Sequence, residues 1–391
     1  MQHKILSEPP DFSLVVGGPL YQLFRKAHLS GAGLELERRR VLVIALTAWL
    51  PLLVLSIIEG HAVGGIKIPF LYDIESHVRF LIALPILVAS EVLVHSRVRL
   101  APKRFLERDI VVEEDIPRFE RAIDASMRIR NSVVIEIALI LLVYSLGFYW
   151  QRLIATSVPS WYSSGGPGMK LTTAGYWYVF VSIPMFQFIW LRWYLRFFIW
   201  AQFLWRVSRL NLNLVATHPD RAEGLGFLGI STYAFGPILF AQGAQLAGVI
   251  ADRVLYDGKD LMAFKLEALG MVIFFMALVL SPLLVFTPKM ARAKRQALAD
   301  YGKLGSRYVQ DFDSKWIKGR EGDEELLGTG DIQSLADLGN SFSVITETRI
   351  VPFGLKDMTR LAVATAAPLL PLSLTVISFE ELVTRLLKII L

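Results

Sequence analysis

Long apolar stretches constrain this chain more than any other feature of its sequence. A helix needs about 20 predominantly apolar residues to cross the hydrocarbon core of a bilayer, because each residue advances it by about 1.5 Å. Six stretches meet this requirement, some with the help of flanking residues: 41–58, 80–94, 133–150, 176–205, 226–251 and 266–286. The sequence therefore predicts an all-α fold, a polytopic bundle of transmembrane helices accompanied by cytoplasmic helices.

A seventh apolar stretch, residues 361–378, differs from the six because it contains Pro368 and Pro371. Proline removes an amide donor and its ring clashes with the preceding turn, so we expect this stretch either to cross with a kink or to enter the membrane and turn back. The predicted organisation is a cytoplasmic N-terminal segment (1–40), a six-span domain (41–287) with a cytoplasmic helical insertion (95–132), a cytoplasmic region (288–360), and a proline-kinked hydrophobic segment with an amphipathic C-terminal helix (361–391).

The basic residues give the orientation. Residues 1–40 have no leading apolar core, so the first span is expected to be an uncleaved signal anchor. Lys and Arg are retained on the cytoplasmic side, and most of the chain's 41 lie in the N-terminal segment and in every second loop after it. This distribution places the N-terminus in the cytoplasm. It also explains the net charge of +6 without nucleic acid, since no nucleic-acid-binding pattern accompanies the basic residues.

The chain has no cysteine and six histidines. The absence of cysteine excludes disulfides, thiolate nucleophiles and cysteine-ligated metal centres. The histidines form no HExxH or other close pair of metal ligands. We expect neither a metal site nor another cofactor, and the sequence assigns no catalytic residue.

Four ionisable residues fall inside predicted spans: Glu91, Glu136, Arg192 and Arg196. Charges in a bilayer are costly and usually face protein or water. All four fall at overlapping depths in the inner half of the membrane, and the two arginines share a helix face because they are four residues apart. We predict a charged layer made of these four residues. It is either the lining of a solute pathway in which the arginines select anions, or a closed set of ion pairs that fixes helix register.

A second cluster, His218, Asp220 and Arg221, lies at the predicted cytoplasmic end of the fifth span. Asp220 suits the N-cap position there, and the free amides of a helix start could hold a phosphate or carboxylate beside His218 and Arg221. A second interpretation is an acid–base pair, His218 with Asp220, that acts on a lipid headgroup. The third is a capped turn that only joins two spans.

Other patterns predict helices and their packing. Residues 109–131 should form a cytoplasmic helix that leads into the third span, and Asp331 is a candidate N-cap for a helix that ends before Pro352. Residues 379–391 predict an amphipathic helix. The fifth span carries small and amide residues that favour close helix packing and interhelical hydrogen bonds over a polar pore lining: Gly229, Gly236, Gln242, Gly243, Gln245 and Gly248.

Several stretches resemble uncharacterised multi-pass inner-membrane proteins of bacteria. They are THPDRAEGLGFLG (217–229), GDIQSLADLGNSF (330–342), VPF (351–353) and the proline-interrupted C-terminal segment. The resemblance extends over most of the chain. It implies a location in the bacterial inner membrane, and no activity comes with it.

These observations favour a non-enzymatic function, the passage of a small ion or solute through the bilayer by a homo-oligomer. The charged layer supplies the candidate residues for the pathway. One alternative is a membrane-bound enzyme that acts on a lipid or isoprenoid headgroup at the cytoplasmic face with His218, Asp220 and Arg221. A second alternative is a membrane scaffold or signalling component that works through the cytoplasmic residues 301–358 and the C-terminal amphipathic helix.

Overall fold

The fold is helical throughout the part of the chain that the structure describes. The computed structural model describes residues 12–28, 37–154, 160–164, 170–319 and 329–375. It is 79% helical and has isolated β-bridges but no strands among these residues. The helices are α1 (Pro19–Lys26), α2 (Glu37–Ile58), α3 (Ile74–His77), α4 (Leu84–Val98), α5 (Leu100–Glu107), α6 (Ile116–Arg130), α7 (Val133–Ile154), α8 (Thr173–Trp177), α9 (Ile183–Val207), α10 (Gly226–Ser231), α11 (Gly236–Tyr256), α12 (Lys265–Leu280), α13 (Thr287–Phe312), α14 (Asp331–Glu347) and α15 (Leu355–Ala366).

Five continuous helical segments are long and apolar enough to cross a membrane. They are Glu37–Ile58, Ile74–Glu107, Thr173–Val207, Gly226–Tyr256 and Leu261–Ile317. Each contains one of the six predicted spans. The remaining predicted span, 133–150, lies in α7, whose apolar part Val133–Ser145 is shorter because the side chains after it lie outside the described residues. The chain therefore has the helices of a multi-pass membrane protein.

Two of these segments change helix type just before a proline. Residues Val78–Ala83 form a π-helical turn ahead of Pro85, and Tyr178–Ser182 form another ahead of Pro184. Proline cannot donate the amide hydrogen bond of a regular helix, and a wider turn accommodates that loss without ending the helix. Both segments consequently continue as one long helix.

The proline-rich seventh stretch packs against the bundle without forming a regular span. α15 has 12 residues and gives way at Ala367 to a 3₁₀ helix, Ala367–Thr375, which contains Pro368 and Pro371. α15 lies against α11, where a Cβ added at Gly243 would lie 2.1 Å from the carbonyl oxygen of Thr365. The regular α-helix therefore ends just before the two prolines. Residues 376–391, which include the predicted amphipathic helix, lie outside the described residues.

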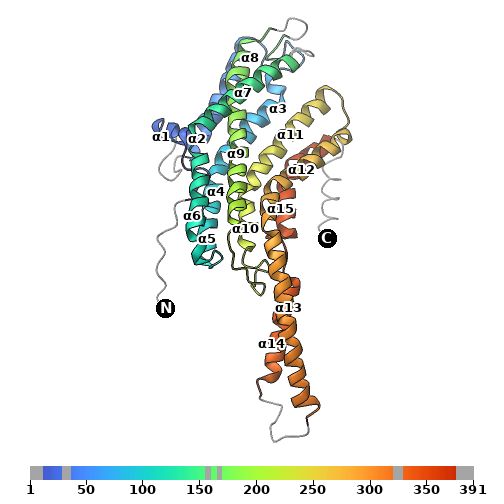
Figure 1. Ribbon diagram of the computed structural model, residues 1–391. Coiled ribbons are helices and arrows are strands. Elements are labelled where there is room, and N and C mark those ends of the chain that lie inside the picture. Colours follow the sequence, from blue (N-terminus) through green and yellow to red (C-terminus); the bar gives the residue numbers. More distant parts are fainter. Residues whose placement is uncertain (1–11, 29–36, 155–159, 165–169, 320–328, 376–391) are drawn as a thin grey trace.

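α13 and α14 form a hairpin that projects away from the bundle (Figure 1). α13 has 26 residues, about 39 Å of helix. The predicted N-cap of α14 is wrong: Gly330 occupies that position without a side-chain cap, and Asp331 is the first helical residue. The Asp331 carboxylate instead accepts a hydrogen bond from Trp316 at 2.9 Å, which ties the start of α14 to the residues after α13.

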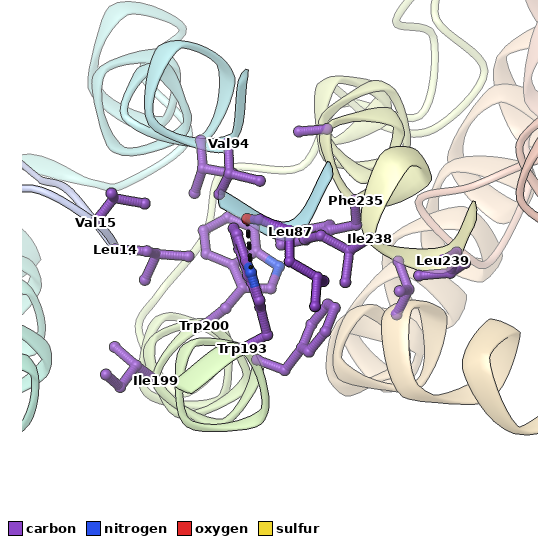
Figure 2. Packing of buried hydrophobic residues seen from close by; sticks show 14 of the residues in the cluster. Leu14, Val15, Leu87, Val94, Trp193, Ile199, Trp200, Phe235, Ile238 and Leu239 are labelled. Carbon is purple, nitrogen blue, oxygen red and sulfur yellow. Dashed lines mark hydrogen bonds between the residues drawn. The ribbon is translucent and has the colours of Figure 1, made fainter. Parts of the chain in front are cut away.

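Aromatic and aliphatic side chains fill the centre of the bundle. Trp193 and Trp200 of α9 pack near Leu87 of α4 and Phe235, which precedes α11 (Figure 2). The Trp193 indole donates a hydrogen bond to the Leu87 carbonyl at 3.1 Å. α6 packs along the same part of α9 and leads into α7 as expected. These contacts form the packed centre of the bundle.

Candidate functional site

The charged layer is assembled from four helices and centres on Glu91. Glu91, on α4, forms an ion pair with Arg196 of α9 at 2.5 Å and with Arg40 of α2 at 2.9 Å. The Arg196 guanidinium also lies over the ring of Trp193, 4.4 Å from its centre. All three charged residues are buried. One carboxylate thus joins three helices that are distant in sequence.

The second ion pair of the layer joins α7 to α9. Glu136 lies 3.6 Å from Arg192 and accepts a hydrogen bond from the Leu20 amide at 2.9 Å. Leu20 belongs to α1, so the carboxylate also anchors the N-terminal segment to the bundle. The structure therefore pairs all four residues of the predicted layer, Glu91 with Arg196 and Glu136 with Arg192, and adds Arg40 as a second partner of Glu91.

Little open space borders the layer. A cavity of about 10 Å³ lies beside Glu91 and Arg192, bounded by apolar side chains of α1, α2, α4 and α9. This is the room that one water molecule needs. In this conformation the layer resembles a closed set of ion pairs more than the wall of an open path.

Sequence reasoning missed Arg40 as a member of this site. It follows Arg38 and Arg39 at the start of the first span, and the three together were interpreted as a topological signal. Arg38 and Arg39 are exposed, whereas Arg40 is 1% exposed. The only signal in the sequence was its position next to the apolar stretch, and the helix face that it occupies depends on how α2 packs against α4.

Asp220 organises the cluster that it forms with His218 and Arg221. Its carboxylate accepts backbone hydrogen bonds from Ala222 at 2.8 Å, Gly224 at 3.1 Å and Gly226 at 3.0 Å. The predicted N-cap is wrong: Asp220 lies six residues before the first residue of α10, and Leu225 occupies the N-cap position. Burial raises the pKa of Asp220, but these amides and the nearby His218 lower it more, so the pKa lies below its ordinary value.

A pocket of about 540 Å³, the hairpin-end pocket, opens beside this loop where α10, α14 and α15 meet. Four cationic side chains line it: Arg108, Arg221, Arg349 and Lys356. Arg221 pairs with Glu347 at 2.7 Å. Arg349 donates two of its side-chain N–H groups to the carbonyl oxygens of Asp220 and Arg221, and these contacts leave its charge uncompensated. His218 is absent from the described lining of the pocket.

Glu223, in the same loop, was not singled out from the sequence. It is 1% exposed, and neither carboxylate oxygen has a hydrogen-bond partner among the described residues. Burial raises its pKa to about 8, although Lys294 of α13 acts in the opposite direction. Its sequence context is that of an ordinary solvated loop, so no local pattern could have indicated this burial.

A larger hollow, the distal cavity, lies at the end of the bundle away from the α13–α14 hairpin. Its volume is about 720 Å³, and residues of α3, α9 and α11 line it together with the loop that carries Tyr162. It contains charged groups that the sequence assigned to loops, Glu75, Arg79 and Asp252. Trp190 of α9 lines this cavity. Arg192 is two residues on, a rotation of about 200°, so the charged layer occupies the opposite face of α9.

Comparison with protein-family models, with curated proteins and with solved structures finds no match. What the molecule can do therefore follows from its own geometry and charge.

Proposed function

We propose that this multi-pass membrane protein passes a small ion or solute across the bacterial inner membrane. In this proposal the six apolar stretches of α2, α4, α7, α9, α11 and α12 span the bilayer, and α15 with the 3₁₀ turns after it is a partly inserted seventh segment. The N-terminus and the α13–α14 hairpin lie in the cytoplasm, as the basic residues favour. We also propose that the protein forms a homo-oligomer.

One observation carries it: the bundle is hollow at both ends and packed in the middle. The distal cavity and the hairpin-end pocket both border the helical segment Gly226–Tyr256, at its opposite ends. Between these two ends of the segment, Phe235 lies in the packed centre of the bundle near Trp193 (Figure 2). Two hollows on either side of a closed centre are what alternating access requires, in which one side opens at a time.

The proposed route follows the face of α9 that meets α11, and the charged layer on the other face of α9 anchors the helices around it. A buried charge that already lies beside an opposite charge is a poor ligand for a passing solute, because each binding event would have to break a desolvated ion pair. We therefore assign Glu91, Glu136, Arg192 and Arg196 a positioning role and place the passing solute in the two hollows.

The test is osmotic swelling of proteoliposomes in a panel of potassium chloride, choline chloride, sodium acetate and glycerol. We expect swelling at least about tenfold faster than in protein-free liposomes for one class of solute. Val249→Trp, which fills the distal cavity, should abolish it, and a folded Arg192→Gln protein should keep the same selectivity. Swelling no faster than in protein-free liposomes for the whole panel contradicts the proposal; altered selectivity in Arg192→Gln returns the route to the charged layer.

A second candidate function is supported by the continuity of the segment Leu261–Ile317, in which an apolar helix runs on into the hairpin. Such an arm could carry a signal or dock a soluble partner. Replacing residues 303–339 by a short Gly-Ser turn should then leave swelling unchanged and abolish the retention of a partner that the whole chain retains. The headgroup-enzyme alternative has weaker support, because His218 does not line the hairpin-end pocket in the described structure.

A further inference from the structure

The distal cavity continues into an apolar groove between α9, α11 and α12. The groove has a volume of about 580 Å³ and shares Trp190, Gln242, Gln245 and Val249 with the cavity. The rest of its lining is almost wholly apolar: Leu191, Tyr194, Leu246, Met271, Phe274 and Phe275. These residues all lie within candidate membrane spans. The polar distal cavity thus opens into an apolar groove at the depth of the lipid tails. This combination fits an amphiphile, which has a polar head and a hydrocarbon tail.

Arg79, whose guanidinium lies in the distal cavity, already has hydrogen-bond partners within the protein. Arg79 donates to the Tyr178 hydroxyl at 2.7 Å and to Glu75. With its amide oxygen turned toward the guanidinium, Gln245 accepts from Nε at 3.1 Å and from Nη2 at 3.0 Å. Four of the five N–H groups of Arg79 therefore have partners, and its positive charge faces Glu75. Little of the positive charge of Arg79 therefore remains to attract an anionic ligand.

Hydrogen-bond acceptors, in contrast, are left over. One oxygen of Glu75 accepts from Arg79, and no described group donates to the other. The side-chain oxygen of Gln187, in the wall of the cavity, is buried and also has no donor among the described residues. The Glu75 side chain is 32% exposed, so its second oxygen is accessible, whereas the Gln187 oxygen is buried without a donor, which is unfavourable. A ligand that donates to either oxygen gains affinity here.

The charge of the distal cavity has the matching sign. Glu75 and Asp252 line it, and the buried Asp73 lies directly behind them, bonded to Ser76 and to the Trp161 indole. Asp73 and Asp252 interact closely enough to carry one negative charge between them, and this charge together with that of Glu75 outweighs the positive charge of Arg79. At the rim the charges of Arg253 and Asp257 are opposite and offset each other. The field in the distal cavity therefore attracts cations.

Aromatic rings complete the surroundings of a cationic head. The rings of Tyr162 and Tyr178 stack with centres 5.2 Å apart, and both residues line the cavity together with Phe186 and Trp190. The face of an aromatic ring attracts an ammonium group, most strongly where water is excluded.

We propose that the distal cavity and the groove bind an amphiphilic organic cation, its ammonium head against Glu75 and Gln187 and its hydrocarbon tail along α9, α11 and α12. The inference deepens the proposed function, and it rests on that function for any passage of the cation across the bilayer. Binding itself can be measured at equilibrium without a gradient.

The experiment uses the whole chain in nanodiscs of zwitterionic lipid, with tritiated decylammonium as the probe and empty nanodiscs as the blank. Unlabelled decylammonium, decan-1-ol and decanoate compete for the site. They share a ten-carbon chain and differ in the charge of the head. We expect decylammonium to displace the probe at a concentration at least about tenfold lower than either of the others, since the ammonium alone makes charge-assisted hydrogen bonds here.

Variants locate the site. Glu75→Gln should weaken decylammonium binding by about tenfold, and Gln187→Leu by about threefold to tenfold, because each removes one acceptor. Glu267→Gln is the matched control: this exposed carboxylate in the first turn of α12 lies outside the cavity lining and should bind within about twofold of the original. The Gln187 oxygen has no hydrogen-bond donor among the described residues, so its replacement breaks no such bond, and this variant decides the matter if Glu75→Gln fails to fold.

Equal displacement by decan-1-ol or decanoate overturns the inference, as does unchanged binding in folded Gln187→Leu protein. The two proposals fail separately. Decylammonium binding without any faster swelling contradicts passage and leaves this site standing. Faster swelling without decylammonium binding contradicts this site and leaves passage standing.

Discussion

At the scale of single residues, the buried carboxylates differ in how completely they are satisfied. Glu91 has two guanidinium partners, and Asp220 accepts three backbone amides. Glu223 has neither, although it lies only three residues after Asp220. Identical chemical groups therefore act in opposite directions on stability, and the difference lies in what their neighbours donate.

Glu91→Gln should destabilise the folded protein strongly. The substitution leaves Arg40 and Arg196 buried without a counter-charge, which in other proteins is unfavourable by about 3–5 kcal/mol. Glu107→Gln is the control, because Glu107 and Lys103 form an exposed pair at 3.4 Å and such a pair contributes under about 1 kcal/mol. Thermal melting in detergent measures both. If Glu91→Gln and Glu107→Gln melt at the same temperature, the charged layer does not anchor the helices.

Glu223 should make stability depend on pH. Its pKa is raised from 4.5 to about 8 in the folded protein, so the folded state binds its proton more tightly than the unfolded state does. Stability from this residue is therefore greatest below about pH 4.5, falls as the pH rises, and the loss is complete above about pH 8.

Glu223→Gln should accordingly leave the melting temperature unchanged near pH 5 and raise it near pH 9, by an amount equivalent to about 1–3 kcal/mol. The exposed Glu120 of α6 is the control, and Glu120→Gln should follow the original chain at both pH values. The difference in melting temperature between the Glu223 variant and the original chain should change from pH 5 to pH 9. A constant difference would contradict the conclusion that Glu223 is buried without a partner.

At the scale of elements, glycines decide how closely α11 meets its neighbours. α11 approaches α15 closely at Gly243, and it approaches α3 closely at Gly248, where an added Cβ would lie 3.2 Å from the Glu75 backbone. The sequence correctly predicted close packing for this small-residue stripe. It did not indicate that the partner on one side would be the proline-rich seventh stretch.

Gly243→Ala should destabilise the protein, because the added methyl would overlap the Thr365 carbonyl and push α15 away from α11. Overlap of this kind is unfavourable by about 1–3 kcal/mol. Gly270→Ala in α12 is the control: nothing lies within 4 Å of its added Cβ, and alanine is the better helix former. The expected melting temperatures are lower for Gly243→Ala and equal or higher for Gly270→Ala. A higher melting temperature for Gly243→Ala than for Gly270→Ala would contradict the close contact between α15 and α11.

At the scale of the whole molecule, the absence of cysteine makes the topology directly measurable. Lys67 and Lys259 are exposed at the end of the distal cavity, and Lys303 is exposed on the hairpin. Single cysteines at Lys67 and Lys259 should react in intact cells, in which the outer membrane has been made permeable, with a maleimide that does not cross the inner membrane. Lys303→Cys should react only after lysis. Labelling of Lys303→Cys in intact cells would invert the proposed orientation.

The sequence by itself determined the class of fold and the kinds of residue that meet inside it. The long apolar helices, the helix before α7 and the pairing of two carboxylates with two guanidinium groups follow from apolar length, helical spacing and the expense of an isolated charge in lipid, which are local properties. Only the tertiary structure decided that Arg40 joins Glu91, that Glu223 is buried, and that Glu75, Arg79 and Gln187 border one cavity. Those residues come from different helices, and which helix faces meet is fixed by packing between segments far apart in the chain.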